Sequence, residues 1–167
     1  MTGHPLPQPD HILLHATCVS IDGRGILLQG PPGSGKSDLA LRLIDQPGMG
    51  IDGQLKRAQL VVDDQVWVTR REQRLIATAP ETLAGKLEIR GLGILAVPNA
   101  SEVELALGVR LSPAAAIERM PGDAHLDILG LSLPLVLIDP ACASAPGRIR
   151  TALDWLEARS NHIAQPK

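Results

Sequence analysis

The sequence predicts a mixed α/β fold that contains more strand than helix. Short apolar runs bounded by turn residues recur along the chain, as in strands, and two segments, 37–45 and 149–158, place apolar residues at helical spacing. Strands and helices do not alternate regularly, which argues against a doubly wound sheet. The 167 residues are enough for one domain with a sizeable core.

The amino-acid composition restricts both the core and the partners. The chain has no Phe or Tyr, and Trp67 and Trp155 are its two tryptophans, so Leu, Ile, Val and Ala must fill the core. The scarcity of aromatic rings and the net charge of −2 argue against a nucleic-acid partner. Cys18 and Cys142 provide neither a disulfide framework nor a metal site, and we expect both to be small buried apolar residues.

The first half of the chain predicts a tail, a hairpin and a helix. We expect residues 1–10 to form a flexible tail, because they are polar and include three prolines, and residues 11–167 to form a single domain. Residues 11–20 alternate as one strand, 22–25 form a turn, and 26–29 form a second strand. Residues 37–45 then predict a helix, which Pro47 and Gly48 end.

The remainder predicts further strands and a last helix. Residues 50–57 are polar and contain glycine, which indicates an irregular connection. Pro146 and Gly147 precede the helix predicted at 149–158. We interpret 60–62, 66–68 paired with 75–77 as a hairpin, 94–97 and 133–138 as strands. Residues 86–91 could also be extended, and 103–107 are a further apolar stretch to which the sequence assigns no role.

One motif carries a clear chemical prediction. The octapeptide Gly-Pro-Pro-Gly-Ser-Gly-Lys-Ser at 30–37 matches G-x-x-x-x-G-K-[ST], with a predicted strand before it and a helix after it. Lys36 would reach the β- and γ-phosphates of a nucleotide, and the Ser37 hydroxyl would bind Mg²⁺. The residues predicted to cradle the phosphates are Gly30, Pro31, Pro32, Gly33, Ser34, Gly35, Lys36 and Ser37.

Several other polar residues could complete the site. Asp63 and Asp64 follow an apolar strand, and because successive strand residues face opposite sides we expect only one of them to face the site. Glu88 and Arg90 would lie on one side of a strand, either as catalytic groups or as a surface ion pair. His15 could orient an acid or a phosphate, or be structural.

Taken together, these motifs resemble a known family. The order is His15, the phosphate loop, Val-Val-Asp-Asp at 61–64, and then Leu-Glu-Ile-Arg-Gly-Leu-Gly-Ile at 87–94. It resembles the catalytic domain of HPr kinase/phosphorylase over roughly residues 11–158, and the octapeptide at 87–94 is the most specific element. The resemblance implies a P-loop domain of the HPr kinase/phosphoenolpyruvate carboxykinase type, a mixed sheet with flanking helices. It also implies a short form that lacks the usual N-terminal domain.

The resemblance implies roles for individual residues. Ser37 and Glu88 would bind magnesium, and Asp64 would accept the proton in the kinase direction and donate it in the reverse direction. His15 matches the family's active-site histidine, and Arg119 an active-site arginine. Gly147 and Arg148 resemble a motif tied to dephosphorylation.

The activity implied is transfer of phosphate from ATP, with Mg²⁺, to a serine of an HPr-like phosphocarrier protein. The reverse reaction, phosphorolysis to pyrophosphate, stays open. The family implies a cytoplasmic homo-oligomer, typically a hexamer, and the sequence has no run long enough to be a membrane span. Two alternatives remain: a P-loop kinase or NTPase acting on a small molecule, and a regulatory nucleotide-binding module without chemistry.

Overall fold

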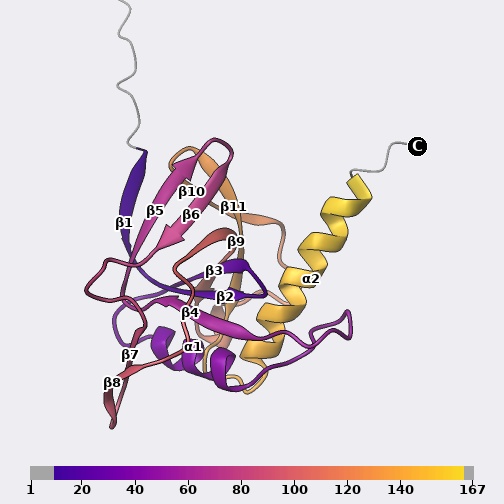
Figure 1. Ribbon diagram of the computed structural model, residues 1–167. Coiled ribbons are helices and arrows are strands. Elements are labelled where there is room, and N and C mark those ends of the chain that lie inside the picture. The colour runs from indigo at the N-terminus through magenta and orange to yellow at the C-terminus, as the bar shows by residue number, and fades with distance from the viewer. Residues whose placement is uncertain (1–9, 164–167) are drawn as a thin grey trace, which may run out of the picture.

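The computed structural model describes residues 10–163, in which a curled mixed sheet carries two α-helices on one side (Figure 1). The predicted tail at 1–10 lies outside the described residues apart from Asp10. Within the described range the strands are β1 (His11–His15), β2 (Thr17–Ile21), β3 (Arg24–Gln29), β4 (Ala58–Val62), β5 (Gln65–Arg71), β6 (Arg74–Thr78), β7 (Lys86–Ile89), β8 (Gly93–Ala96), β9 (Glu102–Leu111), β10 (Ala124–Ile128) and β11 (Leu131–Ile138). The helices are α1 (Lys36–Asp45), the 3₁₀ turn η1 (Ala114–Ala116) and α2 (Ala145–Ile163).

Strand β9 organises the sheet. The strand order is β1-β5-β6-β9-β3-β2-β4, and β11 pairs with β9 and β10, while β7 and β8 form a separate hairpin. On one side β9 runs parallel to β3. On its other side it pairs antiparallel with β6 at 102–104 and parallel with β11 at 108–111. Because two strands share one edge of β9, the sheet divides there and curls.

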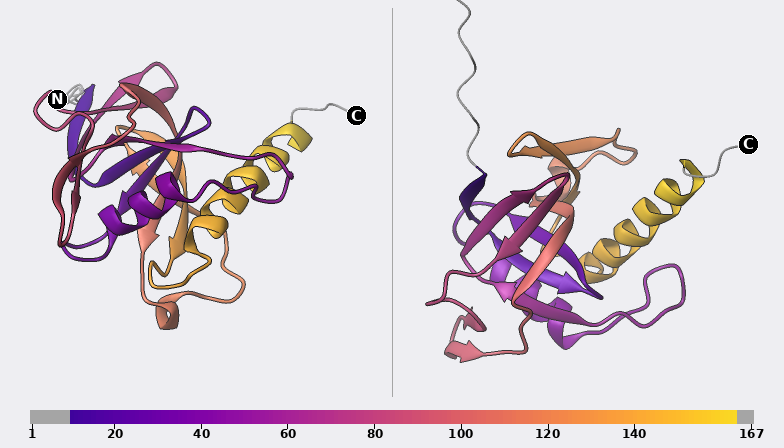
Figure 2. Two further views of the ribbon diagram at one scale, coloured as in Figure 1. Left: turned by 60° about the horizontal axis from the view of Figure 1, so that its bottom comes forward. Right: turned by 45° about the horizontal axis from the view of Figure 1, so that its top comes forward.

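Two apolar cores lie on the two faces of this sheet. Ile26 and Leu28 of β3 face the core that both helices cover, whereas Leu27 between them faces the second core. The second core is enclosed by strands and loops, without either helix. Figure 2 shows both helices on the same side of the strands. The fold class predicted from the sequence, a mixed sheet with flanking helices, is therefore confirmed.

The first predicted strand is wrong in one respect, because residues 11–20 form two strands. β1 pairs with β5, whereas β2 pairs with β3 and β4, so the chain changes partners at Ala16. The Ala16 amide donates a hydrogen bond to the carbonyl of Asp64 at 3.1 Å, outside either ladder. The turn predicted after β2 is present, with positive φ at Asp22 and Gly23.

The helices agree with the sequence more closely than the strands do. α1 begins one residue before the predicted start, and α2 begins at Ala145 rather than at 149. Pro146 and Gly147 therefore lie inside the first turn of α2, where proline is tolerated because the early amides have no intrahelical partner. Strand β10 was not expected from the sequence. Neither helix of residues 10–163 is both long and apolar enough to span a membrane.

A buried arginine of α2 binds the end of α1. Arg150 is 3% exposed, and its Nη2 donates to the carbonyl of Leu43 at 3.0 Å and also to that of Gln46. These carbonyls belong to the C-terminal end of α1, where helix carbonyls lack intrahelical partners and carry partial negative charge. The guanidinium therefore caps α1 from the opposite end to the phosphate loop.

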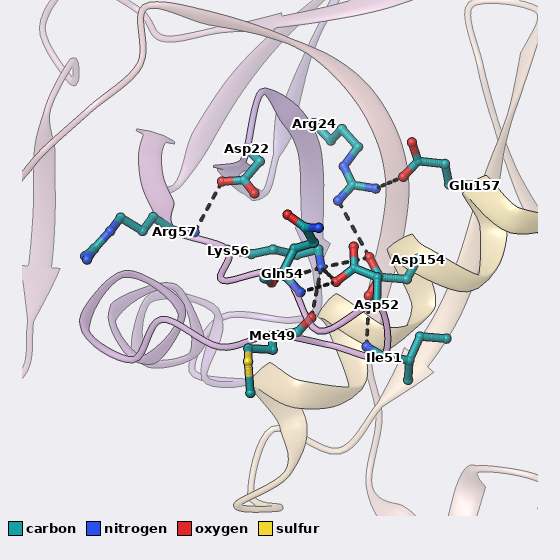
Figure 3. Close-up of polar contacts among 10 residues, drawn as sticks. All are labelled: Asp22, Arg24, Met49, Ile51, Asp52, Gln54, Lys56, Arg57, Asp154 and Glu157. Atoms are coloured by element: carbon teal, nitrogen blue, oxygen red, sulfur yellow. Dashed lines mark hydrogen bonds and ion pairs between the residues drawn. The ribbon is translucent and has the colours of Figure 1, made fainter.

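The connection between α1 and β4 is tied to α2 by a buried lysine (Figure 3). Lys56 is 2% exposed, and its Nζ contacts the carboxylates of Asp52 and Asp154, the latter at 3.2 Å. Burial alone would lower the pKa of Lys56, but hydrogen bonds to these two carboxylates raise it above its ordinary value. Asp154 also accepts a hydrogen bond from the Ile51 amide at 3.0 Å. This irregular segment is thus fixed by charge pairing rather than by apolar packing.

We predict that Asp154→Ala destabilises the domain. The substitution leaves the Lys56 ammonium buried with one partner fewer and the Ile51 amide unpaired, so the free energy of unfolding should fall by about 3 kcal/mol. Urea denaturation measures this change. Glu157→Ala is the matched control, because Glu157 pairs with Arg24 at the surface and its loss should cost less than about 1 kcal/mol. Equal losses in the two variants would contradict the assigned role of Lys56.

Candidate active site

The strand directions bring several chain segments to one edge of the sheet. β2 is antiparallel to both β3 and β4, so the carboxyl ends of β3 and β4 and the start of β2 share an edge. β9 and β11 run parallel to β3 and end on the same side. The phosphate loop follows β3, Asp63 and Asp64 follow β4, and His15 and Thr17 flank the start of β2. Residues distant in sequence therefore meet beside α1.

The phosphate loop at 30–37 has the backbone geometry that its sequence predicts. Gly33 and Gly35 have φ values of 78° and 97°, which side-chain-bearing residues rarely adopt. The Lys36 Nζ lies across the loop and donates to the carbonyls of Gly30 and Pro31 at 2.9 and 3.2 Å. α1 begins at Lys36, so its free amides and its positive dipole end face the same space. This arrangement is typical of P-loop nucleotide-binding proteins.

A cavity of about 570 Å³ lies beside this loop. Its volume falls within the range of sites that hold small organic ligands, about 300–1,000 Å³. Its lining residues come from the loop, α1 and four other segments: Pro32, Gly33, Ser34, Gly35, Lys36, Ser37, Asp38, Leu41, His15, Asp63, Asp64, Glu88, Ile89, Arg90, Pro140 and Ala141.

Asp63 is a buried acceptor at the base of the cavity. It is 7% exposed, and the Ser37 hydroxyl lies 2.9 and 3.0 Å from its two carboxylate oxygens. The Thr17 hydroxyl donates to Oδ1 at 2.8 Å, and the Glu88 amide donates to Oδ2 at 3.3 Å. Asp63 therefore connects the phosphate loop with the strand that carries Glu88.

Asp64 faces the mouth of the same cavity, so the expectation that only one of the two aspartates would face the site is wrong. The chain leaves β4 at Val62, and Asp64 has a φ of 72°, which removes the alternation of an extended strand. Its Oδ1 lies 3.2 Å from Nδ1 of His15, and the two side chains are 61% and 50% exposed. One carboxylate is thus buried at the loop, and the other is open to an incoming molecule.

The hairpin of β7 and β8 provides the opposite wall. Glu88 and Arg90 both line the cavity, and so does Ile89 between them, because β7 ends at Ile89 and Arg90 lies in the following turn. The guanidinium of Arg90 lies over the phosphate loop, since its Nη2 would be 3.7 Å from a Cβ added to Gly33. This cation is placed where negative charge on a bound phosphate would be stabilised.

The remaining wall was not predicted from the sequence. Pro140 and Ala141 follow β11 and line the cavity beside Leu41 of α1. Arg42 of α1 holds this segment by donating to the carbonyls of Pro140 and Cys142. These residues carry no recognisable motif, and their position becomes apparent only when β11 is paired with β9.

Arg119, by contrast, is not brought to the cavity. It is exposed in the segment between η1 and β10, and it is not among the lining residues. Gly147 and Arg148 lie in the first turn of α2 and also do not line the cavity.

The oxygen atoms at the cavity base fit Mg²⁺. The Ser37 hydroxyl contacts the Asp63 carboxylate, and Glu88 also lines the cavity. All three side chains offer hard oxygen donors, which Mg²⁺ prefers. Mg²⁺ usually binds one or two carboxylates plus substrate phosphates, not a cage built from protein alone. Accordingly, residues 10–163 contain no group of three or more His, Cys, Asp or Glu side chains that could hold a metal by itself.

The family of this chain is evident from its similarity to known proteins. A sequence model of the HPr serine kinase C-terminal domain matches residues 9–106, and the chain belongs to this family. The HPr kinase/phosphorylase of Clostridium tetani is 36% identical over 120 residues, covering 71% of this chain and 36% of that protein. The HPr kinase/phosphorylase of Cupriavidus necator is 33% identical over 141 residues, covering 78% of this chain and 41% of that protein. The chain thus spans less than half of the length of these relatives.

A solved structure extends the similarity to the whole fold. The HPr(Ser) kinase/phosphatase of Coxiella burnetii superposes with a TM-score of 0.74 at 26% identity. The match covers 90% of this chain and 99% of that chain. The family expected from the motifs is therefore confirmed, whereas the roles of individual residues stay predictions.

We predict that Lys36→Met weakens ATP binding. A hydrogen bond to a charged group is worth about 1.5–3 kcal/mol, which corresponds to a roughly ten- to hundredfold loss of affinity. Isothermal titration calorimetry with ATP measures it. Lys86→Met is the control, because Lys86 is exposed on β7 and does not line the cavity. Unchanged affinity in Lys36→Met would contradict the assignment of the loop as the phosphate site.

Proposed function

We propose that this domain is an ATP-dependent protein-serine kinase whose acceptor is an HPr-like phosphocarrier protein. The observation that carries the proposal is the exposed pair of Asp64 and His15 at the mouth of a cavity whose base is a phosphate loop. An acceptor side chain on another protein can reach Asp64 from outside, while the nucleotide phosphates lie on the loop. The family membership and the names of the relatives support the same acceptor.

The proposed reaction uses these groups in order. The serine hydroxyl oxygen attacks the γ-phosphorus of ATP, and the bond from that phosphorus to the β–γ bridging oxygen breaks, giving phosphoserine and ADP. Asp64 accepts the hydroxyl proton, because a positioned carboxylate helps most when the oxygen loses its proton late in the transfer. His15, 3.2 Å away, orients the Asp64 carboxylate toward the acceptor.

Charge on the migrating phosphoryl group is stabilised on the other side of the cavity. The ammonium of Lys36 and the amides at the start of α1 would bind the phosphate oxygens. Ser37 and the carboxylates of Asp63 and Glu88 would hold Mg²⁺, which would supply positive charge to offset that of the nucleotide phosphates. In the reverse direction inorganic phosphate would attack phosphoserine, with Asp64 protonating the departing serine oxygen and pyrophosphate as the other product.

The family resemblance supports further parts of the proposal. It favours a cytoplasmic protein that assembles as a homo-oligomer, with a hexamer as the expected state. The net charge of −2 and the near absence of aromatic side chains continue to argue against nucleic acid as a partner. Size-exclusion chromatography with light scattering measures the assembly directly.

We predict that Asp64→Asn abolishes most phosphotransfer while leaving nucleotide binding intact. Loss of the proton acceptor should reduce labelling of HPr from γ-labelled ATP by about 10²–10⁴-fold. ATP affinity should stay within about twofold, because the ion pair described for the Asp64 carboxylate is to His15 and not to a residue of the loop. Asp127→Asn on β10 is the control, since Asp127 is exposed and does not line the cavity.

The identity of the acceptor is tested by incubating the wild-type protein with γ-labelled ATP and HPr. Labelled phosphoserine on HPr, dependent on Mg²⁺, would support the proposal. ATP binding without any label on HPr would refute the acceptor and favour phosphotransfer to a small molecule. Equal loss of ATP binding and of transfer in Asp64→Asn would refute the role of Asp64.

A further inference from the structure

Thr17 is a buried residue that places a hydroxyl group among apolar neighbours. It is fully buried at the start of β2, between Ala16 and Cys18, which are also fully buried, and it pairs with Leu28 of β3. A valine has nearly the same shape and would fill this position without bringing a polar group into the core. Burying a hydroxyl is unfavourable unless it finds a partner, and the partner here is Asp63 at 2.8 Å.

The contacts of Asp63 divide into fixed and adjustable donors. Oδ1 accepts from the Thr17 hydroxyl, and Oδ2 accepts from the backbone amide of Glu88. Thr17 belongs to β2 of the main sheet and the Glu88 amide to β7, so the position of each donor is set by the backbone of a strand. The third donor is the Ser37 hydroxyl, which lies 2.9 and 3.0 Å from the two oxygens but has a single proton to share between them.

The direction of the Ser37 hydroxyl is what matters for a cation. When its proton points to Asp63, the lone pairs of Ser37 Oγ stay free for a metal. The Asp63 carboxylate accepts the Ser37 hydroxyl proton only while its plane keeps its present orientation. The terminal torsion of an aspartate is broad and weakly restrained, so this orientation needs support. The hydrogen bond from Thr17 to Oδ1 and the bond from Glu88 to Oδ2 restrain this torsion from two sides.

We propose that Thr17 is a positioning residue for the magnesium site: it fixes Asp63, and through Asp63 it sets the orientation of Ser37 beside Glu88. Thr17 does not line the cavity, so it acts through Asp63 and touches neither nucleotide nor metal. The inference rests on the proposed use of Mg²⁺ and ATP, but it does not depend on the identity of the acceptor. Partners one step removed from a metal typically change metal affinity or activity by about 10–100-fold when they are lost.

The test compares Thr17→Val, which removes the hydroxyl at nearly constant volume, with Thr17→Ser, which keeps it. Binding of a fluorescent ATP analogue is measured as MgCl₂ is raised, and again in EDTA. For Thr17→Val the half-saturating Mg²⁺ concentration should rise about tenfold. Thr17→Ser should stay near the wild type, and binding in EDTA should be unchanged in both variants.

A second hydroxyl on the same strand provides the matched control. Ser20 is buried at 5% exposure on β2 and does not contact Asp63 in the contacts described for this chain, so Ser20→Ala should keep the wild-type Mg²⁺ dependence. Circular dichroism and urea unfolding establish that the variants are folded. At saturating MgCl₂, Thr17→Val should regain most of its nucleotide binding, which a misfolded loop would not do.

Two outcomes would overturn the inference. A wild-type Mg²⁺ dependence in Thr17→Val would mean that the hydroxyl serves packing alone. Equally weakened binding with and without Mg²⁺ would mean that Thr17 supports the loop as a whole and not the metal site. The identity of the acceptor is tested by a separate experiment. If the protein binds ATP in a Mg²⁺-dependent way but transfers no phosphate to HPr, the proposed kinase activity is refuted, whereas the comparison of the Thr17 variants still holds.

Discussion

The burial of β3 on both faces is the constraint on which the site depends. Ile26, Leu27 and Leu28 are all fully buried, and each contributes roughly 1.5–3 kcal/mol through removal of its side chain from water. A strand held in this way between β2 and β9 cannot shift in register without exposing one face to the wrong core. The loop that follows it therefore leaves the sheet at a fixed point. The ends of β4, β9 and β11 reach the same edge because their directions are set relative to β3.

Local sequence determined the parts of the site that depend on local geometry. The spacing of glycines, Lys36 and Ser37 predicted a phosphate loop between a strand and a helix, and the structure has that order. Glu88 and Arg90 were predicted to share a side and both line the cavity, but Ile89 lines it too and Arg90 lies beyond the end of β7, so strand alternation does not account for their position. The turn at Asp22 and Gly23 also follows from local preferences.

The features that could not be predicted depend on partners distant in the chain. The division of 11–20 at Ala16 arises because β1 pairs with β5 and β2 pairs with β3, which periodicity in one segment cannot show. Pro140 and Ala141 reach the cavity through the pairing of β11 with β9, and strand alternation failed for Asp63 and Asp64 because β4 ends before them. Arg119 was assigned from the family resemblance, and it does not line the cavity of this chain, so its role stays a prediction.

The open position of Asp64 has a consequence for water. Many small-molecule kinases enclose their acceptor, and the closing segment also keeps solvent from the phosphoryl group. Here the carboxylate at the mouth is 61% exposed, so in the proposed reaction the surface of the acceptor protein itself would exclude solvent when it docks. A folded acceptor could then be modified without unfolding. When no acceptor is docked, the rate of ATP hydrolysis would depend on how well the loop shields the bound phosphates from water.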